Sequence, residues 1–325
     1  MTTPEPKMVD VFSDIERETA AVANPAGFAV TELAAENPRI VTLTADLSNT
    51  LAEFTDKFPE RYIELGIAET NSVSLASGLA SCGYVPYIFS MAPFGVLKTA
   101  EQLRTDADYN HLPVRMVGRL AGLAMGYFGT SHYAVEDIAI ARTLNNTTVV
   151  APADANSAIA LIRATADLEG PVYIRMAEAA EKVYDEVPSY DHGRWPQLRH
   201  GGDITLVGHG MGVGLAAAAA EILFEQHSIE ADVFDAAYLR PYDEDALVAS
   251  TRKTGRVLSI EDHSVVGGLG SIIAETAGRH GLVARLAQCA LPAEDLEVGV
   301  PAELYEYYGL TVSNVVDRAR KLARS

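Results

Sequence analysis

Residues 62–83 of the chain read YIELGIAETNSVSLASGLASCG, and this stretch decides the fold. It begins as a short apolar strand, reaches the acidic residue Glu69, and continues as a helix over 71–81 built largely of Ser, Ala and Gly. Such small side chains let another element approach closely, so we expect this helix to be buried or to lie at an interface. Because a helix N-terminus stabilises an anion, Glu69 fits either a first-turn helix acid or a functional carboxylate.

The same succession of strand and helix repeats on both sides of this stretch. In the first half, we predict strands at 39–44, 85–89, 114–117, 148–151 and 172–175, and helices at 25–37, 71–81 and 156–167. In the second half, we predict strands at 204–207, 230–235 and 256–260, and helices at 212–226, 243–251 and 268–280. This alternation is typical of α/β proteins with a mostly parallel sheet.

The periodicity stops between about residues 179 and 202, where Pro188, Trp195 and Pro196 lie among charged residues. We therefore predict a first domain over 1–180, a linker over 181–201 and a second domain over 202–325. Glycines at 208, 210, 212 and 214 follow a strand and open a helix. Their spacing does not match the dinucleotide-binding pattern, so we interpret them as a tight turn between strand and helix.

The charge balance excludes several classes of partner. The chain carries 44 acidic and 25 basic side chains, for a formal net charge of -19. This argues against a nucleic acid or an anionic membrane as the main partner, and a phosphorylated ligand would need a local cluster of donors or donors from another chain. We see no apolar signal core and no apolar run of the roughly 20 residues that a membrane helix needs, so we expect a cytoplasmic protein.

Several further motifs accompany GIAETN at 66–71. They are NPRIVTLTADLSN at 37–49, Phe94 in its loop, GTSH at 129–132, APADAN at 151–156 and EDHSVVGGLG at 261–270. With these motifs the chain resembles the C-terminal half of transketolase, from about Phe28 to Leu322. The resemblance implies an α/β fold of two domains: a parallel-sheet pyrimidine-binding domain of the thiamine diphosphate-binding fold, then an α/β domain like the transketolase C-terminal domain. It also implies a transferase that moves a two-carbon ketol unit from a ketose donor to an aldehyde acceptor.

The resemblance implies a catalytic role for Glu69. This residue matches the glutamate that meets N1' of the aminopyrimidine ring of thiamine diphosphate. A carboxyl group bonded to N1' favours the imino tautomer, whose 4'-nitrogen can remove the proton from thiazolium C2. We expect Glu69 to be ionised without cofactor and to share a proton with it when the cofactor is bound.

Other candidate residues are assigned through the same resemblance. Phe94 matches the aromatic residue that stacks on the pyrimidine ring, although the sequence alone fits a core Phe equally well. Asp46 and Leu47 match residues near the thiazolium, and a strand-end turn is the alternative for Asp46. His132 matches a histidine that contacts a substrate oxygen, where an imidazole can hydrogen-bond a carbonyl or a developing alkoxide. An ordinary loop residue is the alternative for His132.

One half of the expected cofactor site is missing. The family binds the diphosphate and Mg²⁺ through a Gly-Asp-Gly loop followed by an Asn, and Mg²⁺ needs hard oxygen ligands. Here Gly202-Asp203 is followed by Ile204, inside the start of a strand, and we predict no metal ligand in the chain. The chain therefore resembles one subunit of a split transketolase. We expect a separate diphosphate-binding subunit to hold most of the Mg²⁺ contacts, in a heterotetramer of two of each chain.

The predicted substrate pocket departs from the family pattern. Phe128 stands where sugar-phosphate enzymes have an aspartate, and Glu178 stands where an arginine contacts the phosphate; an acid there repels an anion. Arg175 could replace that arginine if the alignment is shifted by three residues, and Arg119 and Ser48 remain candidate anion contacts. We therefore expect a small-molecule sugar or carbonyl substrate that is non-standard or unphosphorylated.

Two alternative functions fit the same sequence. The first is the β subunit of a 2-oxo acid dehydrogenase, or an acyloin-forming enzyme, with the same cofactor and glutamate. The second is a non-catalytic subunit of such a complex, which Phe128 and Glu178 permit and which the retention of Glu69, Phe94 and His132 disfavours.

Overall fold

The first half of the chain supplies most of a seven-stranded sheet in a computed structural model that describes residues 24–177 and 182–324. Its strands lie in the order β10-β5-β6-β4-β3-β1-β2, and all neighbours are parallel except β10 and β5. The strands are β1 (Ile40–Thr44), β2 (Tyr62–Glu64), β3 (Val85–Met91), β4 (Arg115–Arg119), β5 (Thr148–Val150), β6 (Val172–Arg175) and β10 (Tyr238–Arg240). The parallel sheet confirms the predicted fold class.

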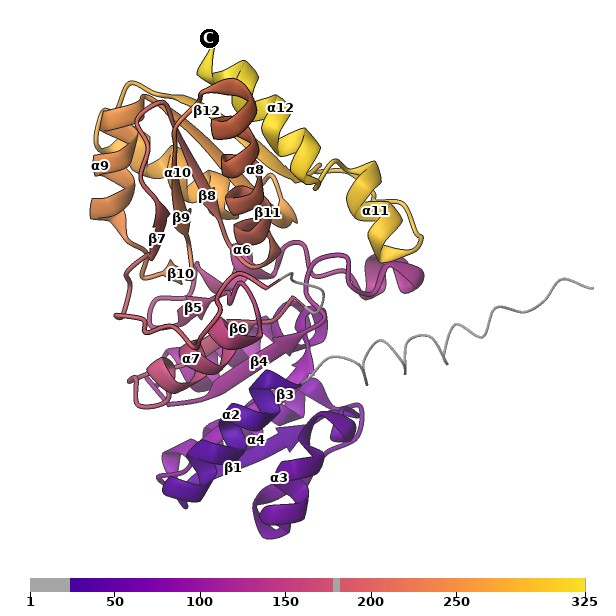
Figure 1. Cartoon of the computed structure of the whole chain (residues 1–325). Helices are drawn as coiled ribbons and strands as arrows, with labels where there is room; N and C mark the ends of the chain where they lie inside the picture. Colours follow the sequence, from indigo (N-terminus) through magenta and orange to yellow (C-terminus); the bar gives the residue numbers. More distant parts are fainter. Residues whose placement is uncertain (1–23, 178–181, 325) are drawn as a thin grey trace, which may run out of the picture.

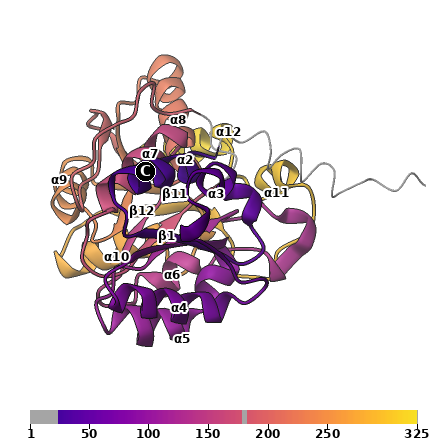
Figure 2. The same ribbon diagram turned by 90° about the horizontal axis from the view of Figure 1, so that it is seen from below.

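Helices cover both faces of this sheet, as expected where buried parallel strands are linked by crossovers. Figure 2 shows α2, α3 and α7 on one face and α4, α5 and α6 on the other. Their bounds are α2 (Pro25–Glu36), α3 (Ala52–Lys57), α4 (Glu69–Ser81), α5 (Ala100–Gln102), α6 (Asp137–Ala141) and α7 (Ala155–Thr165). The buried face of α4 is Ser72, Val73, Ala76, Ser77 and Ala80, and α4 packs against β3. The prediction of a buried small-residue helix is confirmed.

A second sheet follows in the order β12-β11-β8-β9-β7 and lies above the first in Figure 1. Its strands are β7 (Gln197–Arg199), β8 (Ile204–Gly208), β9 (Ala231–Asp235), β11 (Arg256–Ser264) and β12 (Arg285–Leu291). Its helices are α8 (Met211–His227), α9 (Glu244–Thr254), α10 (Leu269–Arg279), α11 (Pro301–Tyr307) and α12 (Val312–Ala323), and α8 packs on α12 as α9 does on α10. The glycine turn is structural, because a Cβ at Gly212 would lie 2.1 Å from the carbonyl oxygen of Ile260.

Two short strands depart from the predicted domain organisation. β7 lies within the predicted linker 181–201 and pairs antiparallel with β9 at the edge of the second sheet. β10 comes from the second half of the chain, yet it pairs with β5 and completes the first sheet. A single apolar core also joins Val117 and Ile174 of the first half with Phe234, Leu239 and residues of α10 in the second. The two halves are therefore interlocked rather than merely linked.

Two buried carboxylates hold the segment that connects the halves. Asp154, at the start of α7, accepts hydrogen bonds from the backbone N–H groups of Val183 and Tyr184 at 2.8 and 2.7 Å. Asp235, at the end of β9, accepts hydrogen bonds from the hydroxyls of Tyr184 and Tyr190 at 2.7 and 2.8 Å. Each half of the chain thus supplies one of the two acids that hold this segment.

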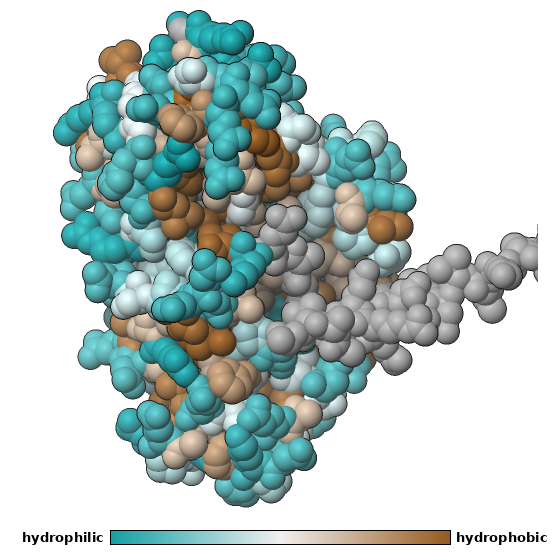
Figure 3. Space-filling model, in the orientation of Figure 1, coloured by the Kyte–Doolittle hydropathy of each residue, from teal (hydrophilic) through white to brown (hydrophobic). Residues whose placement is uncertain are grey.

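In the view of Figure 3, hydrophilic residues cover most of the two ends of the molecule. Within the described residues, the helices are all too short or too polar to cross a bilayer.

Asp235→Asn is expected to remove the pH dependence that Asp235 adds to the free energy of unfolding. Burial raises the pKa of Asp235 to about 6, against the lowering effect of Tyr184 and Tyr190. The folded chain therefore keeps this proton over a pH range in which the unfolded chain loses it, so this group's contribution to stability falls as pH rises from about 4 to 6. At about 1.4 kcal/mol per pKa unit, the variant should gain about 2–3 kcal/mol relative to the parent between pH 4 and pH 7.

Urea unfolding of the parent and the variant at several pH values measures this difference. Asp56→Asn, at an exposed position, is the matched control and should show no such trend. A constant difference between Asp235→Asn and the parent from pH 4 to pH 7 would contradict the prediction.

Candidate active site

The candidate site lies where four neighbouring parallel strands end. β4, β3, β1 and β2 are adjacent in the sheet, and parallel strands present their carboxyl ends at one edge. The loop after β1 carries Asp46, Leu47 and Ser48, and the loop after β2 leads to Glu69 at the first position of α4. Phe94 follows β3, and the loop after β4 leads to His132. The topology thus gathers most of the predicted residues at this edge.

Glu69 is the buried acid of the site. Its side chain is 5% exposed, and its Oε2 accepts a hydrogen bond from Nζ of Lys98 at 2.6 Å. Lys98 directly follows η3 (Pro93–Leu97), a π-helical turn after β3, and its Nζ also lies 5.9 Å from the centre of the Phe94 ring. Lys98 is not among the residues predicted from the sequence. Its position one turn after Phe94 was the available signal, because residues four apart on a helix share a face.

Three aromatic rings pack together beside this ion pair. The His132 ring stacks on Phe128, with ring centres 4.7 Å apart, and meets Phe94 edge to face at 5.1 Å. Phe128 belongs to η5 (Gly126–Ser131), and Gly129 turns the chain within it at φ 69°. A Cβ at Gly129 would lie 2.8 Å from the side chain of Val298, so both backbone and packing require glycine. The geometry joins Phe94, His132 and Phe128 in one cluster.

His132 has the properties of a neutral hydrogen-bonding imidazole. Partial burial lowers the pKa of His132 below its usual value, so the neutral form prevails at pH 7. Its Nδ1 lies 2.8 Å from the hydroxyl oxygen of Ser131. If the hydroxyl donates to Nδ1, then Nε2 carries the proton and can donate to a substrate oxygen.

Glu64 fixes the loops that carry the proposed cofactor residues. Its carboxylate accepts hydrogen bonds from the hydroxyls of Thr44 and Tyr62 and from the backbone N–H groups of Asp46 and Gly66, at 3.1 and 2.8 Å for the last two. Asp46 has a left-handed backbone with φ 61°, which a non-glycine residue adopts at a cost. Burial acts to raise the pKa of Glu64, but these hydrogen bonds outweigh it, so the pKa lies below its usual value. Glu64 was not predicted as a site residue, although it lies within residues 62–83.

Glu64→Ala is expected to destabilise the chain by about 1–2 kcal/mol, because four donors lose a charged acceptor that water partly replaces. Glu64→Gln should cost less, since the amide oxygen can still accept two of these bonds. The loss should shrink at acid pH, because a lowered pKa contributes stability above its unfolded value that is lost as pH falls through the folded pKa.

Urea unfolding checks this prediction, with Glu60→Ala as control. Glu60 lies four residues earlier, its side chain is 69% exposed, and it lies 3.5 Å from Arg61, so its loss should cost little. Equal effects of the two alanine variants would contradict the role given to Glu64.

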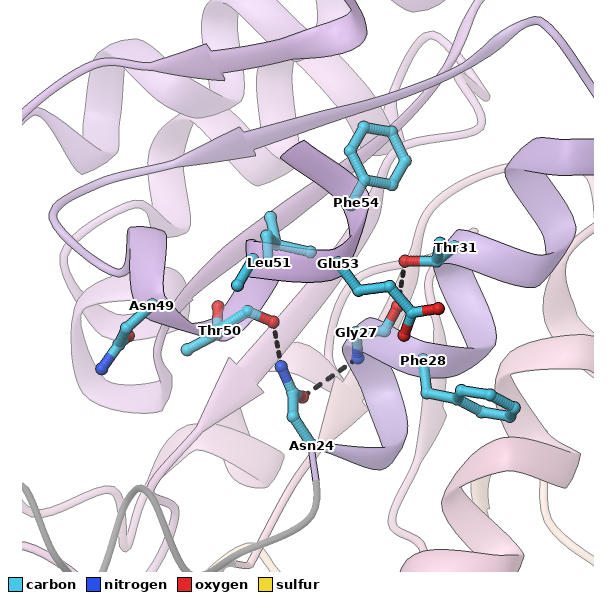
Figure 4. Close-up of a pocket in the computed structure, with 10 residues that line it drawn as sticks. Asn24, Gly27, Phe28, Thr31, Asn49, Thr50, Leu51, Glu53 and Phe54 are labelled. Carbon is cyan, nitrogen blue, oxygen red and sulfur yellow. Dashed lines mark hydrogen bonds between the residues drawn. The ribbon is translucent and has the colours of Figure 1, made fainter. Parts of the chain in front are cut away.

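A pocket of about 220 Å³ adjoins the loop that follows β1 (Figure 4). Asn24 at the start of α2 accepts a hydrogen bond from the backbone N–H of Gly27 at 3.0 Å and donates its side-chain amide to the carbonyl of Thr50. Thr50 belongs to η1 (Ser48–Leu51), which begins at Ser48. The Asn24 side chain therefore ties the start of α2 to the turn that follows β1 and begins at Ser48.

Arg175 does not lie where a substrate anion could reach it, which corrects the prediction. Its guanidinium is fully buried and bonds Asp137 through Nε at 2.9 Å and Asp262 through Nη1 at 2.7 Å. Asp262 thus has an internal partner: burial acts to raise the pKa of Asp262, but Arg175 and the neighbouring histidines together lower it. Arg119 at the end of β4 is also buried, at 6% exposed, and stays a prediction as an anion contact. Glu178 lies outside the described residues.

The residues present fit an aminopyrimidine ring. A buried carboxylate at a helix N-terminus, with an aromatic ring and a neutral imidazole next to it, offers an acceptor for a ring N–H and a surface for stacking. Over residues 24–177 and 182–324, no cluster of three His, Cys, Asp or Glu side chains has the arrangement of a metal site.

Comparison with family models covers nearly the whole chain. Residues 18–181 match the model described as transketolase, pyrimidine binding domain. Residues 193–315 match the model described as transketolase, C-terminal domain.

Two relatives of similar length are named as transketolase subunits. The 6-deoxy-6-sulfo-D-fructose transketolase subunit SqwH of Clostridium sp. is 34% identical over 301 residues, which is 90% of this chain and 91% of that protein. A subunit of the apulose-4-phosphate transketolase of Phocaeicola vulgatus is 31% identical over 297 residues, which is 90% of this chain and 94% of that protein.

Solved structures share the fold. A split gene transketolase, described as an inactive β4 tetramer, is 37% identical with a TM-score of 0.86 and covers 93% of this chain and 97% of its own. The transketolase of Pichia stipitis in complex with sedoheptulose-7-phosphate has a TM-score of 0.78 at 20% identity, and the match spans 46% of that protein.

Proposed function

The chain belongs to the transketolase family, and we propose that it is the pyrimidine-binding subunit of a split enzyme that transfers a two-carbon ketol unit with thiamine diphosphate. The observation that carries this proposal is the buried Glu69 carboxylate at the start of α4, next to Phe94 and His132. Proteins described as transketolase subunits align with at least nine-tenths of this chain, which supports a divided enzyme.

The residues of this chain have separate tasks in the proposed reaction. Glu69 accepts a hydrogen bond from the pyrimidine N1' and holds the proton there, while Phe94 packs on the ring. Asp46 and Leu47 line the thiazolium side. His132, neutral and with one ring N–H, donates to the oxygen of the substrate carbonyl, where negative charge develops. When bound, thiamine diphosphate supplies the carbon that attacks the ketose carbonyl and carries the two-carbon unit.

We further propose that the substrate is a non-standard or unphosphorylated ketose. The Phe128 ring, stacked on His132, puts apolar surface beside the reacting carbonyl. The phosphate-contacting arginine of the family has no counterpart in Arg175, which is paired inside the protein. The relatives named for sulfofructose and apulose-4-phosphate support an unusual sugar.

For the other half of the cofactor, we propose a separate subunit that holds the diphosphate and supplies most of the Mg²⁺ ligands. The complex would be a heterotetramer of two of each chain. The similar split gene transketolase described as an inactive β4 tetramer supports a need for a second chain. A cytoplasmic location is proposed for the complex.

Co-purification with a candidate diphosphate-binding chain, followed by a donor screen with thiamine diphosphate and Mg²⁺, tests the proposal. We expect cofactor-dependent ketol transfer by the pair and by neither chain alone, with higher turnover of an unphosphorylated or non-standard ketose than of xylulose-5-phosphate or fructose-6-phosphate. Clear preference for these two standard phosphorylated ketoses would overturn the substrate proposal. Turnover of 2-oxo acids in place of ketoses would overturn the reaction, and a stable pair without any turnover would favour a non-catalytic role.

A further inference from the structure

Glu69 has a cationic partner that its proposed role does not include. Nζ of Lys98 lies 2.6 Å from Oε2 of Glu69, and the lysine and glutamate side chains are 47% and 5% exposed. The carboxylate is therefore enclosed by the protein, whereas the ammonium reaches it from the solvent side. Of the two, the lysine is the one that can leave the pair without exposing or repacking the core.

The fold holds Lys98 at this place. Its backbone N–H donates to the carbonyl of Pro93 at 3.3 Å and closes the π-helical turn that also carries Phe94. The next residue, Thr99, is buried and bonds the carbonyl of Gly95. The backbone of this turn is thus fixed, and the flexible four-carbon stem of Lys98 is the part that can move.

The ion pair with Lys98 and the proposed contact with the cofactor both use the carboxylate of Glu69. A buried carboxylate without a partner is costly, so some donor must face Glu69 before the cofactor arrives. Lys98 is that donor. An aminopyrimidine ring bonded to Glu69 and stacked on Phe94 would enter the space between these side chains, where the ammonium now lies 5.9 Å from the ring of Phe94.

Resting on the proposed function, we propose that Lys98 is a positioning residue that holds Glu69 in the cofactor-free chain and gives way when the cofactor binds. Lys98 holds the Glu69 carboxylate in place through the ion pair, and it competes with the pyrimidine ring for this carboxylate. When a site is open to its ligand only part of the time, the apparent affinity falls by that fraction. The ion pair therefore stabilises the cofactor-free site and weakens cofactor binding.

Lys98→Met tests the competition, because methionine keeps much of the stem and removes the charge. In the reconstituted complex with Mg²⁺, calorimetric titration should give a Kd for thiamine diphosphate about 3- to 10-fold lower than the parent's. The isolated variant chain should melt at a lower temperature, because Glu69 loses its partner. Lys98→Arg keeps the ion pair and should bind like the parent. Lys57→Met, which breaks an exposed pair with Glu53, is the matched control.

Two further measurements separate the possible outcomes. The affinity ratio of parent and Lys98→Met should approach one at high salt, which screens a half-exposed pair, and in a Glu69→Gln background, where the carboxylate is gone. An unchanged or higher Kd for Lys98→Met would overturn the inference and would mean that Lys98 shares the carboxylate or contacts the cofactor. The proposed function is tested separately by turnover. Normal turnover of Glu69→Gln would refute it, regardless of the Kd that Lys98→Met shows.

Discussion

Glu69→Ala is expected to lower kcat of the reconstituted complex by about 10³-fold at saturating thiamine diphosphate and Mg²⁺. Proton transfer by a positioned side chain contributes roughly 10²–10⁴-fold to a rate, and Glu69 is the acid aimed at the proposed ring nitrogen. Its side chain is 5% exposed, so water cannot readily take its place. Steady-state ketol transfer under saturating cofactor measures the loss, and titration of the cofactor separates it from weakened binding.

Assembly provides the control for this loss. Glu69→Ala removes a buried charge and leaves Lys98 half-exposed, so we expect the variant to fold and to associate with its partner, as size-exclusion chromatography can check. Glu69→Gln should also lose most of its activity, because an amide cannot hold the proton. Glu53→Ala, which removes an exposed carboxylate, should be fully active. A kcat for Glu69→Ala within about threefold of the parent would refute the assignment.

Arg175→Met is expected to cost about 3–5 kcal/mol of unfolding free energy. The substitution leaves the carboxyl groups of Asp137 and Asp262 buried without their cationic partner, and breaking a buried ion pair from one side typically costs this much. Arg175 also donates to the carbonyls of Ala134 and Asp262, at 3.1 Å each, so several acceptors lose their donor together. Urea or thermal unfolding of the isolated chain measures the effect.

A surface arginine gives the comparison for Arg175. Arg163 pairs with Glu32 on the surface, where both side chains are nearly half exposed, and Arg163→Met should cost less than about 1 kcal/mol. Adding Asp137→Asn and Asp262→Asn to Arg175→Met should recover part of the loss, since the unpaired charges are then gone. A cost below about 1 kcal/mol for Arg175→Met alone would show that the ion pairs contribute little to the fold.

The repeating units of the fold could be predicted because their signals are local. Asn24 followed by Pro25 predicts the start of α2, and the Asn24 side chain does accept the hydrogen bond of a helix cap. The strands over 85–91 and 172–175 are rich in apolar and aromatic residues, which is typical of buried parallel strands. β10 could not be predicted in its place, because three residues carry little pattern and its partner β5 lies about 90 positions earlier.

The residues of the candidate site could also be predicted only in part. The convergence of Glu69, Phe94 and His132 was expected from family-like motifs, and the structure brings them together at one edge of the sheet. The ion pairing of Arg175 inside the protein depends on Asp262, 87 residues away on the other sheet. No local sequence pattern indicates that contact. Lys98 was not predicted, because only the tertiary position of Glu69 gives this lysine a partner.

The strand exchange between the halves limits where this protein can be divided. A fragment that stops before β10 would leave the backbone groups of β5 unpaired along an open sheet edge, and such edges recruit other strands and aggregate. A fragment that starts after β6 would carry β10 with nothing to pair with. We therefore expect that a cut between the two sheets would leave neither fragment able to fold as it does in the whole chain.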